Sequence, residues 1–106
     1  MATHIPAEWR QGAYLESLYQ EFCAQTTGQH SAALQRLLNW LRSEPMEGKL
    51  AVLCTTPHRH WVLVRMQGRG RPLSVLGERF TDIDAAERAI FRHRVRERLG
   101  HVIRSA

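Results

Sequence analysis

The sequence predicts an α+β domain in which a helical hairpin and a C-terminal helix pack on a small antiparallel sheet. Three observations predict this class. Apolar residues recur at helical spacing up to Arg42, the period of the pattern changes to two from Lys49, and helical spacing returns after Thr81. The expected element order is α-α-β-β-(β)-α. At 106 residues the chain is long enough for one domain and too short for two, so we predict a single domain over residues 1–106.

Two helices are expected before the sheet. The first covers about residues 6–25 and has Pro6 near its start, where a missing N–H costs nothing. The second begins near Ser31, a favourable N-cap residue, and ends at about Arg42. Because only a short turn separates them, the two helices should form an antiparallel hairpin. The apolar face of the second helix has the spacing i, i+3, i+4, i+7 at Leu34, Leu37, Leu38 and Leu41.

The sheet is expected from residues 49–56 and 60–66, which are joined by a turn at 57–59. In the second strand, alternation places Val62 and Val64 on one face and Trp61 and Leu63 on the other. A glycine-rich turn at 68–72 precedes a possible short third strand at 73–76. Such short connections favour an antiparallel meander.

The last helix is expected to begin with a capping box, in which Thr81 is the N-cap and Asp84 lies at the third helical position. Gly100 is a plausible C-terminal stop. The arginines of this helix are expected to face solvent, or nearly so. They are Arg88, Arg92, Arg94, Arg96 and Arg98.

Charge is unevenly distributed along the chain. Residues 1–48 hold three Lys+Arg and five Asp+Glu, a balance of −2, whereas residues 49–106 hold twelve and five, a balance of +7. This asymmetry indicates a surface for a negatively charged partner, either nucleic acid or an acidic protein and less favourably a membrane.

The cellular setting is expected to be the cytoplasm. The amino end lacks the pattern of a signal peptide, and no stretch of eighteen apolar residues is present. We therefore expect no membrane partner. Cys23 and Cys54 are expected to be reduced and to act as small buried apolar groups.

No residue set predicts chemistry on this chain. Cys54, His58 and His60 lie near one another in the sequence, and His93 could be brought near them. A zinc site needs four converging ligands, or three with an open position, so the two histidines, which share a face at i and i+2, would form a partial site at most, and ordinary turn and surface histidines are favoured. No serine has the setting of an activated nucleophile. The turn at 68–72 lacks the spacing and following helix of a phosphate-binding loop. We therefore predict no catalytic, cofactor or metal residues here.

A basic nucleic-acid-binding module is the main alternative from these residues. Arg59, Arg69 and Arg71 lie on two turns, and the last helix adds five arginines that could contact phosphates. No recognised groove-reading or base-stacking motif accompanies them.

The C-terminal half resembles a known family. A Pro45-Met46-Glu47-Gly48-Lys49 turn leads into paired strands, followed by Glu78-Arg79-Phe80 and by a helix bearing Ala89-Ile90-Phe91. This order, over about residues 38–99, is similar to the small (alpha) subunit of bacterial N,N-dimethylformamidase.

The resemblance implies an accessory subunit of an amide hydrolase. It implies that the catalytic residues and the iron belong to a large partner subunit, and that the substrate is a small N-substituted amide. The small chain would dock on that subunit and stabilise it. Our candidates for the contact are aromatic and arginine residues, which dominate binding energy at subunit interfaces. Core packing of the aromatics and solvation of the arginines remain the alternatives. The candidates are Trp61, Arg79, Phe80, Arg88, Phe91 and Arg92.

Overall fold

A computed structural model describes residues 5–43, 48–68 and 70–104 of the chain. It confirms the predicted α+β class: two helices precede three antiparallel strands and a C-terminal helix. The elements are a short 3-10 helix η1 (Ala7–Arg10), α1 (Gly12–Ala24), α2 (Ala32–Leu41), β1 (Leu50–Thr56), β2 (His60–Arg65), β3 (Ser74–Phe80) and α3 (Ile83–Leu99).

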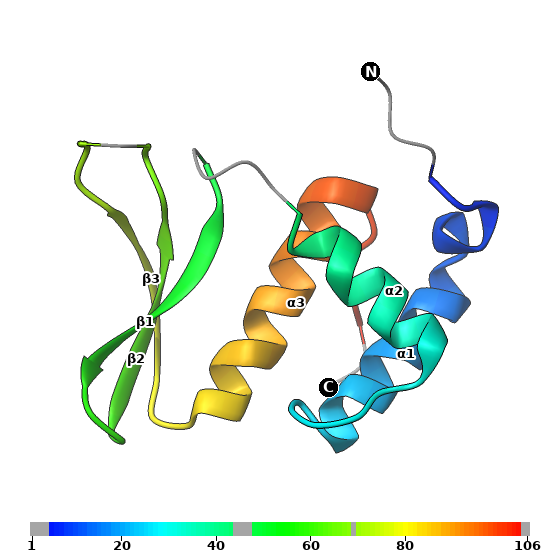
Figure 1. Cartoon of the computed structure of the whole chain (residues 1–106), viewed down its shortest axis with the longest axis horizontal. Coiled ribbons are helices and arrows are strands. Elements are labelled where there is room, and N and C mark those ends of the chain that lie inside the picture. The colour runs from blue at the N-terminus through cyan, green and yellow to red at the C-terminus, as the bar shows by residue number, and fades with distance from the viewer. Residues whose placement is uncertain (1–4, 44–47, 69, 105–106) are drawn as a thin grey trace.

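The elements form three layers, with α3 in the middle. Figure 1 shows the sheet against one side of α3 and the α1–α2 hairpin against the other. The hairpin therefore reaches the sheet through α3. Within the described residues, no helix packs on the second face of the sheet.

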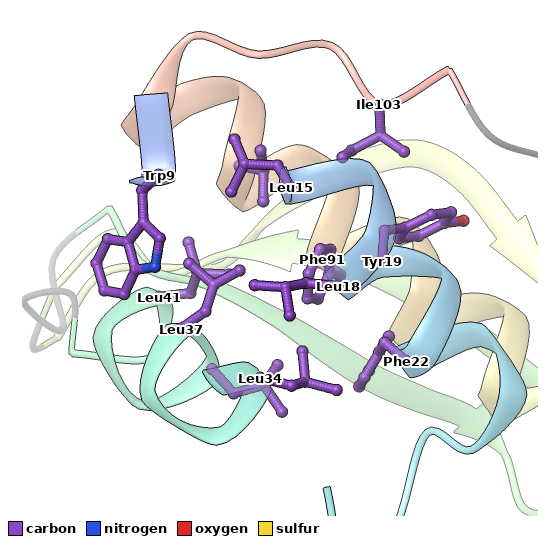
Figure 2. Close-up of a cluster of buried hydrophobic side chains, with 12 residues drawn as sticks. Trp9, Leu15, Leu18, Tyr19, Phe22, Leu34, Leu37, Leu41, Phe91 and Ile103 are labelled. Atoms are coloured by element: carbon purple, nitrogen blue, oxygen red, sulfur yellow. The ribbon is translucent and has the colours of Figure 1, made fainter. Parts of the chain in front are cut away.

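The larger core lies between the hairpin and α3. Figure 2 shows Leu15, Leu18 and Leu37 converging on Phe91 from the two hairpin helices. The Phe91 ring stacks on Phe22, with 5.0 Å between ring centroids. A second, smaller cluster joins α3 to the sheet, and its members are Leu50, Leu63, Ala89 and Ile90.

The hairpin differs from the prediction at its start. The expected helix over residues 6–25 is broken at Gln11, which has an extended backbone (φ −96°, ψ 115°) between η1 and α1. The predicted cap at Ser31 is confirmed, because its hydroxyl accepts a 3.1 Å hydrogen bond from the N–H of Leu34. Ser31 is itself held by Glu21, whose carboxylate accepts from the Ser31 N–H and hydroxyl, each at 2.7 Å.

The sheet has the order β1-β2-β3, as expected for a meander. The third strand continues to Phe80, well beyond the predicted 73–76. The register of β2 with β3 shifts between Val62 and Val64, where residues 76–78 oppose Leu63. This irregularity falls on the polar Gly77-Glu78 segment, which interrupts the alternating apolar pattern, so the sequence alone predicts a shorter strand.

The predicted capping box of α3 is wrong. Its N-cap is Asp82, whose carboxylate accepts from the N–H of Asp84 at 3.1 Å, and Thr81 precedes the cap. The Asp84 carboxylate instead accepts a 2.5 Å hydrogen bond from the Thr26 hydroxyl, which fixes the interhelical turn to α3. The predicted stop at Gly100 is confirmed, since its φ of 73° is left-handed.

Candidate partner interface

Among the described residues, no helix packs on the face of the sheet that points away from α3. Strand register places six side chains on it in two rows of three. We call these six residues the outer face. The rows across β1, β2 and β3 are Ala51–Val64–Val75 and Leu53–Val62–Arg79.

The outer face is apolar across its centre and open at its rim. Val62 and Val64 are 4% and 2% exposed, yet neither belongs to either core cluster. Val75 is 60% exposed and Leu53 39% exposed. Continuous burial of Val62, Leu63 and Val64 is typical of a strand covered on both faces, so this face resembles one half of a core.

Arg79 is the charged member of the outer face. It is exposed, and its register partner across the sheet is Val62. Within the part of the chain that the structure describes, no carboxylate pairs with Arg79. Glu78, its neighbour along β3, lies on the opposite face, where it contacts His93 of α3 at 2.5 Å. The outer face therefore combines an apolar centre with an uncompensated positive charge.

The predicted aromatic candidates lie elsewhere. Trp61 and Phe80 face each other across β2 and β3 and are half-buried on the side of α3. Phe80 packs against the smaller core cluster. Phe91 is 2% exposed at the centre of the larger core, so as described it presents no surface to a partner. For Phe91 the structure shows core packing, the alternative that the sequence left open.

Two more candidates, Arg88 and Arg92, are half-buried on α3 and have intramolecular partners. Arg88 lies 3.8 Å from the carboxylate of Asp82. Arg92 donates a 2.6 Å hydrogen bond to the Tyr19 hydroxyl. Burial is the main cause that raises the pKa of Tyr19 above its ordinary value, so the phenol is neutral near pH 7.

The expectation that all five α3 arginines face solvent is wrong for Arg94. Its side chain is buried, at 9% exposure, and donates a 2.9 Å hydrogen bond to the carbonyl oxygen of Leu50. Arg98 stacks over Trp40, with its guanidinium carbon 3.8 Å from the ring centroid. The arginines of α3 therefore do not form one continuous basic face. A helical pattern of arginines could not distinguish a buried arginine from an exposed one.

A shallow hollow of about 140 Å³ lies between α3 and the C-terminal segment. Arg92, His93 and Arg96 line one wall, and Val102 and Ile103 the other. Val102 is 57% exposed. This hollow is a second open surface of the described chain, and it is separate from the outer face.

The described residues contain no group of three or more His, Cys, Asp or Glu side chains that could hold a metal ion. His58 and His60 are exposed around the β1–β2 turn, whereas His93 is bound to Glu78. Both cysteines are free. The expectation that both are buried is wrong for Cys54, which is exposed near the end of β1, and Cys23 is half-buried beside the larger core.

None of the helices in the described ranges combines the length and apolar character needed to cross a bilayer. Comparison with known families gives a specific result. The family of N,N-dimethylformamidase alpha subunits matches residues 11–104. The chain belongs to this family.

The family match extends the resemblance found in the sequence over about residues 38–99. It begins just before α1 and continues through the sheet and α3 into the C-terminal segment, so the hairpin is part of the family pattern too. No curated protein matches the chain. An alpha subunit is one component of a complex, so family membership implies a partner subunit.

Proposed function

We propose that this chain is a non-catalytic accessory subunit of an amide hydrolase, which docks on a larger catalytic subunit and stabilises it. The complex would hydrolyse small N-substituted amides to an amine and a carboxylic acid. Membership of the dimethylformamidase alpha subunit family supports a subunit role. The docking role, the nature of the partner and the location of the chemistry are the proposed steps.

One observation carries the docking role, namely the apolar outer face that no described part of the chain covers. The exposed apolar surface of this face lies at its rim, where Val75 keeps 60% and Leu53 39% of its surface exposed, whereas the central Val62 and Val64 are already buried. Burial of apolar surface is worth about 25 cal/mol per Å², so covering this face with another protein favours association. Exposed apolar patches rimmed by polar residues mark such contacts.

The iron of the proposed complex would be held by the larger subunit. The described histidines of this chain that lie near acidic groups already have structural partners: His93 contacts Glu78, and His101 contacts Glu16 at 3.0 Å. Because the described residues gather no set of metal ligands, we assign this chain a structural part in the complex.

Amide hydrolysis assays on the separated and the assembled protein test the proposal. The complex purified from the native host should release amine from N,N-dimethylformamide, and the purified accessory chain should release none. Adding the chain back to its separated partner should restore activity or prolong its half-life. Hydrolysis by the accessory chain alone would contradict the proposal. So would a partner whose activity and half-life are the same with and without the chain.

A further inference from the structure

We infer that the outer face is the surface that meets the larger subunit, and that the partner places an acidic side chain against Arg79 within an otherwise apolar contact. This inference rests on the proposed function and deepens it, since it names the surface and the chemistry of the partner. It also states that the contact joins two different chains rather than two copies of this one.

The central strand β2 has an unusually apolar composition for a surface strand. A strand at the surface of an antiparallel sheet normally alternates between apolar and polar residues. In β2, Val62, Leu63 and Val64 are consecutive and all at most 4% exposed. Leu63 packs on α3, but the two valines face away from it and lie outside both cores. Among the described residues, no helix packs on the side to which these valines point, so a second layer on that side would have to come from another chain.

The charge of Arg79 indicates the chemistry of the partner. Arg79 lies in the same row as Leu53 and Val62, and none of the six residues of the outer face is acidic. A guanidinium in an apolar contact needs a carboxylate, because burying an unpaired charge is strongly unfavourable. Arginine binds a carboxylate through two parallel hydrogen bonds, which fixes the orientation of the two chains. The partner surface should therefore be apolar with an acidic residue facing Arg79.

The same charge disfavours a second copy of this chain as the occupant. A two-fold contact places the same patch on both sides. Two outer faces in contact would bring together two Arg79 side chains and no carboxylate from either set of six residues. Like charges at an interface oppose association. Charge complementarity therefore selects a different, acidic partner.

The chain offers a matched pair of variants for testing the surface. Val75 and Val102 are the same residue type and are 60% and 57% exposed, but Val75 lies on the outer face and Val102 lines the hollow beside α3. We would purify tagged wild type, Val75→Asp and Val102→Asp from the native host and measure the recovered larger subunit. Unfolding midpoints would establish that each variant is folded.

The inference predicts that Val75→Asp lowers recovery of the larger subunit by about tenfold or more, and that Val102→Asp leaves it unchanged. Arg79→Glu should lower it similarly, whereas Arg96→Glu, an exposed arginine lining the hollow, should not. The inference would be overturned if recovery fell with the Val102 and Arg96 variants instead, or if both outer-face variants left recovery undiminished. It would also be overturned if the chain self-associated and Arg79→Glu abolished that self-association. Failure of wild type to recover any larger subunit would instead contradict the proposed function itself.

Discussion

The guanidinium of Arg94 donates a 2.9 Å hydrogen bond to the carbonyl oxygen of Leu50, and so joins the middle of α3 to the first residue of β1. A second link lies close by, because Arg65 of β2 contacts Glu97 of α3 at 2.5 Å and donates to the carbonyl oxygen of Gly48 at 2.8 Å. These contacts fix the sheet against α3 and thereby determine which face of the sheet remains open.

Replacing Arg94 should destabilise the fold. Arg94→Met keeps most of the apolar stem but removes the donor to Leu50, and we expect a loss of about 1.5–3 kcal/mol in the free energy of unfolding. Urea denaturation followed by circular dichroism measures this. Arg96→Met is the matched control, because Arg96 is exposed on the same helix, and it should change stability by less than about 0.5 kcal/mol. Equal effects of the two substitutions would contradict the structural role of Arg94.

Phe91 should act on stability through the larger core. Phe91→Ala removes the ring that stacks on Phe22, and a loss of about 3–5 kcal/mol is expected in denaturant unfolding. Phe80→Ala should cost less, because Phe80 is only half-buried. A Phe91→Ala protein with wild-type stability but no partner binding would restore Phe91 as an interface residue.

Acid should weaken the contact between Glu21 and Ser31. Hydrogen bonds from the Ser31 backbone, and then from its side chain, lower the pKa of Glu21 below its ordinary value. The folded state thus binds the proton less readily than the unfolded state. The contribution to stability is present above the unfolded pKa of about 4.3, and is lost as pH falls through the lower folded pKa.

Glu21→Gln tests this pH dependence. At pH 7 the variant should be less stable than wild type, because a neutral amide accepts the Ser31 hydrogen bonds less strongly than a carboxylate does. The loss should be only about 0.5–1 kcal/mol, because the site is open to solvent. The difference from wild type should shrink as the pH falls below about 4. Thermal unfolding at pH 7 and pH 3 measures it, and a difference that is constant or grows in acid would contradict the assigned contact.

Gly100 and Gly77 form a pair of positions that isolates the effect of backbone strain, because a side chain would be uncrowded at both. A Cβ at either position would meet no atom within 4 Å, but Gly100 alone of the two has a left-handed φ, of 73°. Gly100→Ala should therefore cost about 1 kcal/mol, and Gly77→Ala should be neutral or slightly stabilising. Thermal unfolding of both variants measures the difference. A larger loss of stability for Gly77→Ala than for Gly100→Ala would contradict this prediction.

Sequence patterning predicted the elements whose signals are local. The Ser31 cap, the leucine face of α2 and the Gly100 stop depend on neighbours within a few residues, and the structure confirms them. The extent of β3 depends on pairing with β2 across an irregular register, which the segment Gly77-Glu78 does not encode locally. The cap of α3 was misplaced by one residue because Asp84 bonds to the distant Thr26.

The candidate interface could be predicted only in part. Alternation placed Val62 and Val64 on one face of β2, but sequence alone could not show that α3 covers the opposite face. Arg79 was selected as a contact residue by type, and its place beside Val62 follows from the register. Whether an arginine on α3 is buried, as Arg94 is, depends on how the helix rotates against the sheet.

Native mass spectrometry of the chain, purified by affinity from its own host, tests the central proposal most directly. We predict a stoichiometric complex with one much larger chain that carries iron. A chain recovered only as a free monomer or homodimer, or bound to nucleic acid, would contradict it.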